Sequence, residues 1–282
     1  MASGKDDPYG TGPIYFWGGW PLPWNSNAVG SGATMYGTTS VYVIFYGNGW
    51  SSFTKTQLQD YLRHMGGSTW WGLNKQYGVG NIHLGGYYQV PATSNLLGFN
   101  DLVNVVVSSI DAKASSWHNV GLGNGTPGDV YVVLTDSTVD VGDSGYGSGF
   151  CTQYCGYHSA FYYNNKDIKF AWVGDASRCP SVVGYSSSLL NPDNSDSPNG
   201  SFQFDSMVNV LSHELAEMTS DPLLDTWFDG YGNENADKCV WDFGSVSKGT
   251  STNPNGYWNE RVGTFRYLIQ ENWNLASQTC TN

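Results

Sequence analysis

Two runs of almost uninterrupted apolar residues mark the interior of the protein. Val41–Tyr46 and Asp129–Thr135 are rich in β-branched and aromatic residues, and the first ends at Gly47. Runs of this length and composition predict buried strands. Weaker apolar patterns predict three further strands before residue 175 and one near the end of the chain: 79–90, His158–Tyr163, Lys169–Val173 and Thr264–Gln270. The pair 158–163 and 169–173 is expected to form a hairpin.

Between these strands the spacing of apolar residues changes to that of helices. A helix is predicted over Thr54–Met65, capped at Ser52 or Thr54 and ended by two glycines, and another over about 100–114. Strand, helix, strand, helix, strand in this order predicts a mixed β-sheet packed with helices, an α+β fold with an α/β-like core. We expect a single domain over 1–282, in which 1–40 is an irregular, aromatic-rich segment and 41–280 is the body.

A third helix is predicted from the apolar residues that follow Ser201. Ser201 or Asp205 is a suitable cap, and Asp221 before Pro222 marks the end, because a residue that precedes proline is pushed out of the helical conformation. The last two turns of this otherwise apolar helix contain His213, Glu214 and Glu217. Three ionisable groups at such a place cost free energy unless something pairs with them.

The segment His213–Glu217 reads HELAE, which is the pattern of a zinc-peptidase helix with glutamate in place of the second histidine. His213 and Glu217 are four residues apart and therefore share one helix face, where both can bind one metal ion. Glu214 is then placed to act as a general base. The alternative interpretation is a helix end whose polar residues face water, and the pattern alone leaves both open.

A third ligand is expected from the acidic loop Asp229–Cys239, about twenty residues downstream. Asp237 is the first choice and Glu234 the second, and a disulfide at Cys239 would hold Asp237 in place. The alternative is an ordinary acidic turn. His158 is a further candidate, as a ligand, as a donor that stabilises the transition state or as a packed histidine.

Composition limits the possible partners. The chain has 24 acidic and 12 basic residues and a net charge of −12, which argues against nucleic acid and anionic membranes. Charged residues make up only 13%, while glycine, tyrosine and tryptophan are plentiful, a mixture typical of extracellular proteins. No apolar run approaches the length of a membrane span.

The five cysteines fit two disulfides and one thiol better than a zinc cluster, because no paired C-x-x-C knuckles occur. A bond between Cys239 and Cys280 would tie the C-terminal tail to the acidic loop. Cys151 could pair with Cys155 or with Cys179, and the short spacing favours Cys155.

In order and sequence, several of these segments resemble the phosphate-induced protein 1 (EXORDIUM-like) family, and the similarity extends from Gly12 to Cys280. The segments are Val41–Trp50, Trp70-Trp71, Val130–Thr135, Cys151–His158, Phe170–Gly174, Arg178–Pro180, His213–Glu217 with Pro222, and Glu234–Cys239. The resemblance implies an extracellular or cell-wall-associated protein, linked in plants to growth and cell expansion. The residues that match the family at the helix and the loop are His213, Glu214, Glu217, Glu234 and Asp237.

These observations lead to a main hypothesis and two alternatives. The main one is a secreted, monomeric zinc metallohydrolase, and more specifically a peptidase acting on a peptide or protein. In it His213, Glu217 and Asp237 or Glu234 bind Zn²⁺, Glu214 is the base and His158 stabilises the oxyanion. One imidazole and two carboxylates also suit calcium or manganese. The first alternative is a non-catalytic protein that binds cell-wall polysaccharide and holds a structural Ca²⁺. The second is a glycosidase with two catalytic carboxylates.

Overall fold

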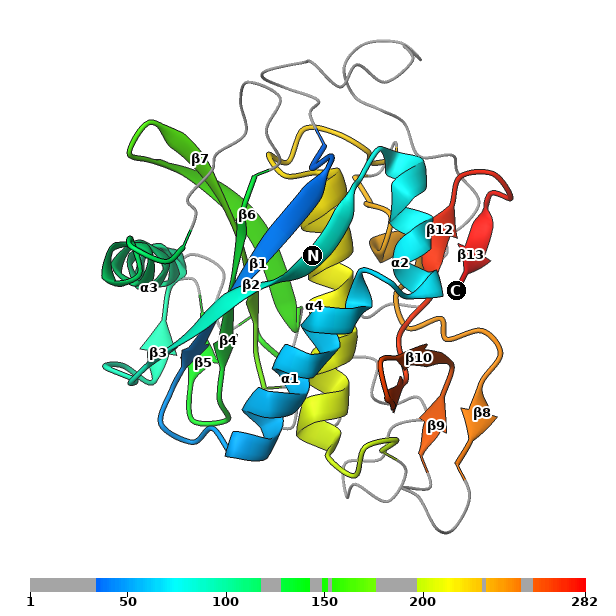
Figure 1. The fold of residues 1–282 in the computed structure, drawn as a ribbon, viewed down its shortest axis with the longest axis horizontal. Coiled ribbons are helices and arrows are strands. Elements are labelled where there is room, and N and C mark those ends of the chain that lie inside the picture. Colours follow the sequence, from blue (N-terminus) through cyan, green and yellow to red (C-terminus); the bar gives the residue numbers. More distant parts are fainter. Residues whose placement is uncertain are drawn as a thin grey trace.

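A five-stranded mixed sheet forms the centre of the protein in a computed structural model (Figure 1). The structure describes residues 34–117, 128–142, 149–151, 154–175, 197–229, 232–249 and 256–282. The strand order is β2-β1-β4-β7-β6. Neighbouring strands run parallel except at the end of the sheet, where β6 is antiparallel to β7. The strands are β1 (Thr38–Tyr46), β2 (Asn81–Val90), β4 (Val130–Thr135), β6 (Gly156–Tyr163) and β7 (Lys166–Val173).

Helices cover both faces of the sheet, which explains why its central strands are apolar throughout. All six residues of β4 and the last six of β1 are buried. Helix α3 (Phe99–Ala112) lies on one side of the sheet, while α1 (Ser52–Met65) and α4 (Phe202–Ser220) lie on the other (Figure 1). Parallel strands are usually covered in this way and therefore read as continuous hydrophobic runs.

The helix boundaries follow local capping chemistry. The N-cap of helix α1 is Ser51, one residue before the earlier of the two predicted caps, and it accepts a hydrogen bond from the backbone N–H of Thr54 at 2.9 Å. Helix α4 is capped at Ser201, as predicted, and ends before Asp221. Helix α3 begins after Gly98, whose backbone N–H donates to the carboxylate of Asp101 at 2.8 Å.

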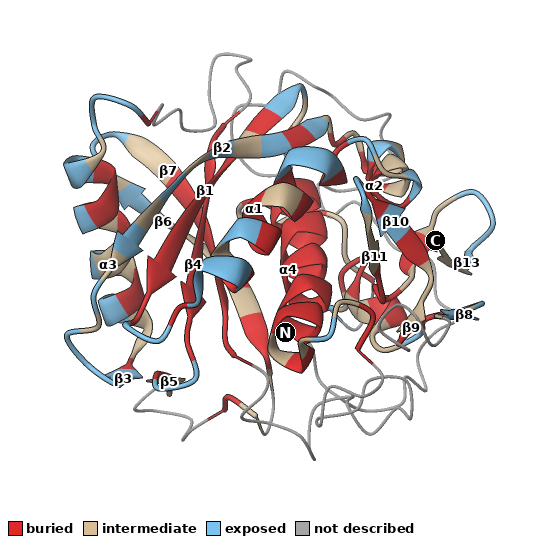
Figure 2. Cartoon of the chain, turned by 60° about the horizontal axis from the view of Figure 1, so that its bottom comes forward, coloured by how far each residue is buried: buried red, intermediate tan, exposed pale blue. Residues whose placement is uncertain are grey.

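Helix α4 is the most enclosed element of the protein. Every residue from Phe204 to Ser220 is buried, so this helix is red along almost its whole length in Figure 2. The sheet packs on one side of it, and the C-terminal part of the chain lies on the other (Figure 1). A helix buried on all sides cannot place polar residues in water. The water-facing interpretation of His213, Glu214 and Glu217 is therefore wrong.

After α4, the described chain forms short antiparallel hairpins, turns and one short 3-10 helix. Its strands pair as β8 (Ser247–Lys248) with β9 (Tyr257–Trp258), β10 (Glu260–Val262) with β11 (Phe265–Tyr267), and β12 (Asn272–Asn274) with β13 (Thr279–Thr281). The predicted strand 264–270 is thus shorter than expected. The remaining elements are α2 (Thr69–Asn74), β3 (Leu96–Leu97), β5 (Asp140–Val141), η1 (Lys75–Tyr77) and η3 (Asp237–Cys239).

Helix α2 was not predicted, because its six residues include two tryptophans that carry no helical signal. Its cap is Ser68, which accepts from the backbone N–H of Trp71 at 3.0 Å. The Trp70 indole N–H donates to the backbone carbonyl of Gln270 at 2.7 Å, across 200 residues of sequence. Tertiary contacts of this kind hold a short helix that local sequence does not specify.

The predicted α+β fold with a mixed sheet and packed helices is confirmed. The predicted irregular segment 1–40 lies mostly outside the described residues, which begin at Thr34. Within the described chain, no helix combines the length and apolarity needed to cross a membrane.

Candidate metal centre

The C-terminal half of α4 carries the first part of the site. His213, Glu214 and Glu217 have exposed fractions of 1%, 0% and 0%. One helical turn brings His213 Nε2 within 3.2 Å of Glu217 Oε1. The predicted pairing of these two side chains on one face of the helix is therefore present.

The acidic loop brings a carboxylate to the same place. Asp237 begins the short helix η3, and its Oδ1 atom lies 3.5 Å from His213 Nε2. The backbone N–H of Asp237 donates to Glu217 Oε1 at 2.9 Å, so the loop is also bonded to the helix glutamate. The other carboxylate oxygen of Asp237 accepts from the backbone N–H of Glu234 at 3.3 Å. The loop is therefore more than an ordinary surface turn.

Strand β6 supplies a second histidine. His158 Nε2 lies 3.0 Å from Glu234 Oε2 and 3.9 Å from Glu217 Oε2. Its side chain is 2% exposed, while those of Glu234 and Asp237 are 10% and 12% exposed. Of the two carboxylates considered as the third ligand, Asp237 faces His213 and Glu234 faces His158.

These side chains form two groups of three potential ligands that share Glu217. In each group, His213–Glu217–Asp237 and His158–Glu217–Glu234, the ligand atoms lie within 4.8 Å of one another. Zinc binds nitrogen and oxygen at about 2.0–2.2 Å, so two ligands of a tetrahedral ion are about 3.3–3.6 Å apart. The distances around His213, 3.2 and 3.5 Å, agree with that spacing.

The donor types favour a transition metal over calcium. Each group combines one imidazole with two carboxylates, whereas calcium sites are built from oxygen ligands and take six to eight of them. His213 Nε2, Glu217 Oε2 and Glu234 Oε1 are buried and form no hydrogen bond with any residue that the structure describes. Buried polar atoms without partners are costly, and coordination of a cation removes that cost.

The pKa values of the ionisable groups in the site are shifted by burial and by the charges of their neighbours. Burial alone would lower the pKa of His213, but the charge of Glu217 and the contact with Asp237 outweigh burial and raise it well above the ordinary value. Burial raises the pKa of Glu234 well above its ordinary value, and the charges of Glu217 and Asp237 add to this. Burial lowers the pKa of His158, although Glu217 and Glu214 oppose it.

Glu214 lies beside these groups but belongs to neither. It is completely buried, and within the described part of the chain neither of its carboxylate oxygens accepts a hydrogen bond. Burial raises its pKa to about 7, the charge of Glu217 adds to the rise, and His213 acts in the opposite direction. A carboxylate whose pKa lies near neutrality and which is not engaged elsewhere is suited to transfer protons.

Gly156 makes the close approach of β6 to α4 possible, and sequence reasoning missed it. A methyl group at this position would lie 2.9 Å from Glu214 Oε1 and 2.8 Å from the backbone carbonyl of Trp172. Both distances are shorter than ordinary van der Waals contact. The sequence signal that could have indicated the role of Gly156 was its position at the start of a strand, two residues before His158.

The cysteine predictions were half right. Cys239 and Cys280 form a disulfide, which anchors η3 and its Asp237 to the last strand. Cys151 also takes part in a disulfide, but Cys155 is a buried thiol. The favoured bond between Cys151 and Cys155 is therefore wrong, and Cys179, the other partner considered, lies outside the described residues.

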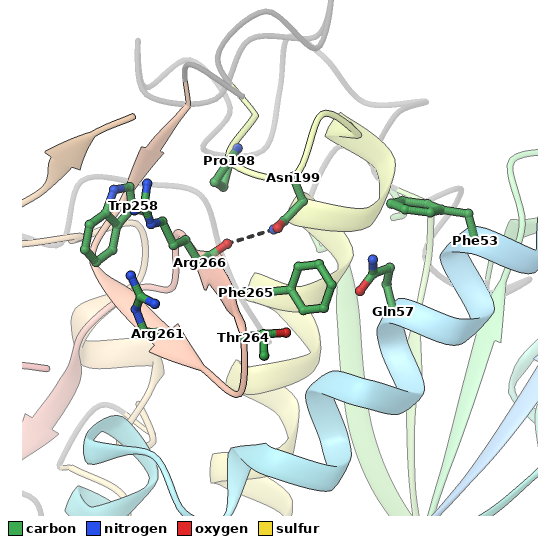
Figure 3. A pocket seen from close by; sticks show the side chains of 9 residues that line it. All are labelled: Phe53, Gln57, Pro198, Asn199, Trp258, Arg261, Thr264, Phe265 and Arg266. Atoms are coloured by element: carbon green, nitrogen blue, oxygen red, sulfur yellow. Dashed lines mark hydrogen bonds between the residues drawn. The ribbon is translucent and has the colours of Figure 1, made fainter. Parts of the chain in front are cut away.

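A pocket of about 380 Å³ lies elsewhere, at the N-terminal end of α4 (Figure 3). The start of α4 and His213 are separated by about 17 Å along the helix axis at 1.5 Å per residue. Trp258, Arg261 and Arg266 line one side, and Phe53 and Gln57 of α1 face them across Phe265. Arg261 and Arg266 are directly opposite each other in the β10–β11 pair.

Fold and site together define an α+β protein with a buried cluster of histidines and carboxylates that can hold a metal ion. Residues 29–282 match the phosphate-induced protein 1 conserved region, and the chain belongs to this family. Two similar proteins come from Arabidopsis thaliana. Protein EXORDIUM-like 3 is 26% identical over 89% of this chain and 81% of its own length. Protein EXORDIUM-like 5 is 27% identical over 86% and 73%. No solved structure matches the chain.

Proposed function

We propose that this protein is a secreted, metal-dependent hydrolase that uses zinc and cleaves peptide bonds. The observation that carries the proposal is the convergence of His213, Glu217 and Asp237 beside Glu214, a buried carboxylate without a hydrogen-bond partner among the described residues. A zinc ion in such a site polarises a carbonyl group and makes water a stronger nucleophile at neutral pH. Glu214 then accepts the proton of the attacking water and passes it to the leaving amine.

The position of β6 supports a peptide as the substrate. This strand is at the end of the sheet, and it carries His158 next to the cluster. An extended peptide can add to the edge of a sheet through backbone hydrogen bonds. A peptide bound to this edge would pass close to the metal ligands. His158 would then face the scissile bond from the strand, while Glu234 fixes the orientation of its ring.

The Cys239–Cys280 disulfide supports secretion, because such bonds persist in oxidising compartments. The composition, low in charge and rich in glycine and tyrosine, agrees with an extracellular location.

Elemental analysis combined with a peptidase assay tests the proposal. Wild type is expected to contain zinc and to cleave extended peptides. Glu214→Gln should keep the zinc, since Glu214 is in neither ligand group, but lose activity by about 10²- to 10⁴-fold. Asp111→Asn is a matched control, because its exposed carboxylate is on α3, on the other side of the sheet. Equal activity of Glu214→Gln and wild type would overturn the proposal.

The pocket at the start of α4 favours a second candidate function, a non-catalytic protein that binds carbohydrate. Aromatic rings and polar side chains line it together, and the Arg266 guanidinium lies over the Trp258 ring at 4.9 Å. Like charges that face each other across a strand pair are destabilising, so the Arg261–Arg266 pair is suited to an acidic sugar. Calorimetry with acidic and neutral oligosaccharides tests this function. Binding that is unchanged in Arg261→Gln would exclude the pocket.

A further inference from the structure

The most unusual property of the cluster is that the two oxygens of one carboxylate face different histidines. Glu217 Oε1 lies 3.2 Å from His213 Nε2, and Glu217 Oε2 lies 3.9 Å from His158 Nε2. Each histidine also faces one further carboxylate, Asp237 for His213 and Glu234 for His158. The arrangement therefore consists of two sets of the same composition. Each set has one histidine and one carboxylate that the other set lacks, and both sets share Glu217.

We propose that the cluster binds two divalent metal ions, with Glu217 as the bridging carboxylate, His213 and Asp237 on the first ion, and His158 and Glu234 on the second. This inference rests on the proposed function and assigns His158 a ligand's role. Two-metal sites in hydrolases hold their ions about 3.5–4 Å apart, a distance that a bridging carboxylate spans.

The number of carboxylates in the cluster argues for a second metal ion. Glu217, Glu234 and Asp237 carry three negative charges when ionised, and Glu214 adds a fourth within the same buried region. One divalent ion leaves a net charge of −2 in a place with little water, whereas two ions balance the charge. Buried charges are costly unless they are paired or coordinate a metal. Lys238, which lies in the same loop, donates instead to Asp229 at 3.3 Å.

The second set also has the features of a coordination site by itself. His158 and Glu217 are buried, and Glu234 Oε1 and Glu217 Oε2 form no hydrogen bond in the parts of the chain that the structure describes. If His158 served only to orient Glu234, Glu217 Oε2 would be left without a favourable partner. An ion between His158, Glu217 and Glu234 satisfies all three.

Zinc stoichiometry tests the inference. The purified protein is stripped with a chelator, equilibrated with Zn²⁺ alone and dialysed, and bound zinc is measured by plasma mass spectrometry. We expect two zinc ions per chain in wild type and one in each of His158→Ala, Glu234→Gln, His213→Ala and Asp237→Asn. His64→Ala is the matched control, because this histidine is half-exposed on α1, and it should keep two ions.

The possible results separate this inference from the proposed function. One ion in both wild type and His158→Ala overturns the second ion and leaves a mononuclear hydrolase. No zinc in wild type overturns both, and two ions in both His158→Ala and Glu234→Gln overturns the assignment of the ligands. Glu234→Gln keeps the size of the side chain, so it remains informative if His158→Ala does not fold, as checked by circular dichroism.

Discussion

Asp237 donates its backbone N–H to Glu217 Oε1 at 2.9 Å, across twenty residues of sequence. This bond joins the acidic loop to α4 at the same oxygen atom that faces His213. Loop and helix are thus held together by the backbone, so the loop carboxylate is positioned before any ion binds. Such preorganisation reduces the conformational entropy that binding would otherwise cost.

The first prediction concerns stabilisation by metal. A ligand that binds only the folded protein stabilises it by about 2.7 kcal/mol at a concentration of 100 Kd. For a chain of this size, that corresponds to an increase in Tm of roughly 5–10 °C. Calorimetry should show this increase when zinc is added to chelator-treated wild type, and a smaller increase with His213→Ala, which has lost one of the two proposed ions. His64→Ala should respond like wild type, and an equal response of His213→Ala would contradict the prediction.

The second prediction concerns Gly156. Replacing it with alanine places a methyl group against Glu214 and the backbone of Trp172, so β6 must move away from α4. Overpacking of this kind costs about 1–3 kcal/mol. We expect a lower free energy of unfolding in denaturant titrations and weaker zinc binding, because His158 moves with the strand. Gly72→Ala is a suitable control, since a methyl group there meets nothing within 4 Å. Equal stability of Gly156→Ala and wild type would count against the tight packing.

The third prediction concerns Asp205 in the first turn of α4. Burial raises its pKa to about 7, although hydrogen bonds from Asn199 act to lower it. The folded state therefore keeps this proton up to a higher pH than the unfolded chain does. Its contribution to stability is fully present below about pH 4 and is lost as the pH rises to about 7, on the order of 4 kcal/mol in all.

Urea titrations between pH 4 and 8 check this prediction. The free energy of unfolding of wild type should fall more steeply with pH than that of Asp205→Asn, which does not titrate at this position. Asp111→Asn, with its exposed side chain, should follow wild type. Parallel pH profiles of wild type and Asp205→Asn would show that the buried carboxyl group is not the cause.

The fourth prediction concerns the Cys239–Cys280 disulfide, which closes a segment of 41 residues. Removing a cross-link over this length increases the entropy of the unfolded chain and costs up to about 4 kcal/mol. The double variant Cys239→Ser/Cys280→Ser should unfold at lower urea concentration. It should also bind zinc more weakly, because η3 carries both Cys239 and Asp237. Unchanged zinc affinity would show that the backbone bond to Glu217 suffices to hold Asp237.

The sequence predicted the elements whose signal is local or periodic. The apolar runs of β1 and β4 and the apolar face of α1 could be predicted without knowing what they pack against. The HELAE segment indicated the helix that carries the candidate site. Asp237, the first choice for the third ligand, lies 3.5 Å from His213, and its role as a ligand stays a prediction. What escaped prediction depends on contacts distant in sequence. Helix α2 is held by Gln270, and nothing near Gly156 in the chain reveals that Glu214 will pack against it.

The place of His158 illustrates the same limit. Its residue type allowed three roles, and only the pairing of β6 with β7 puts its ring against Glu217 and Glu234. Spacing along a helix is fixed by helix geometry, whereas the meeting of a strand and a loop 76 residues apart is a property of the whole fold.

The enclosure of α4 makes the cluster depend on the whole fold. Its side chains come from the edge of the sheet, from helix α4 and from a loop that is tied to the last strand, so they meet only when all three parts are packed together. The proposed metal site would therefore report on the packing of the chain that follows α4. Substitutions far from the cluster that loosen this part are expected to weaken zinc binding before they unfold the protein.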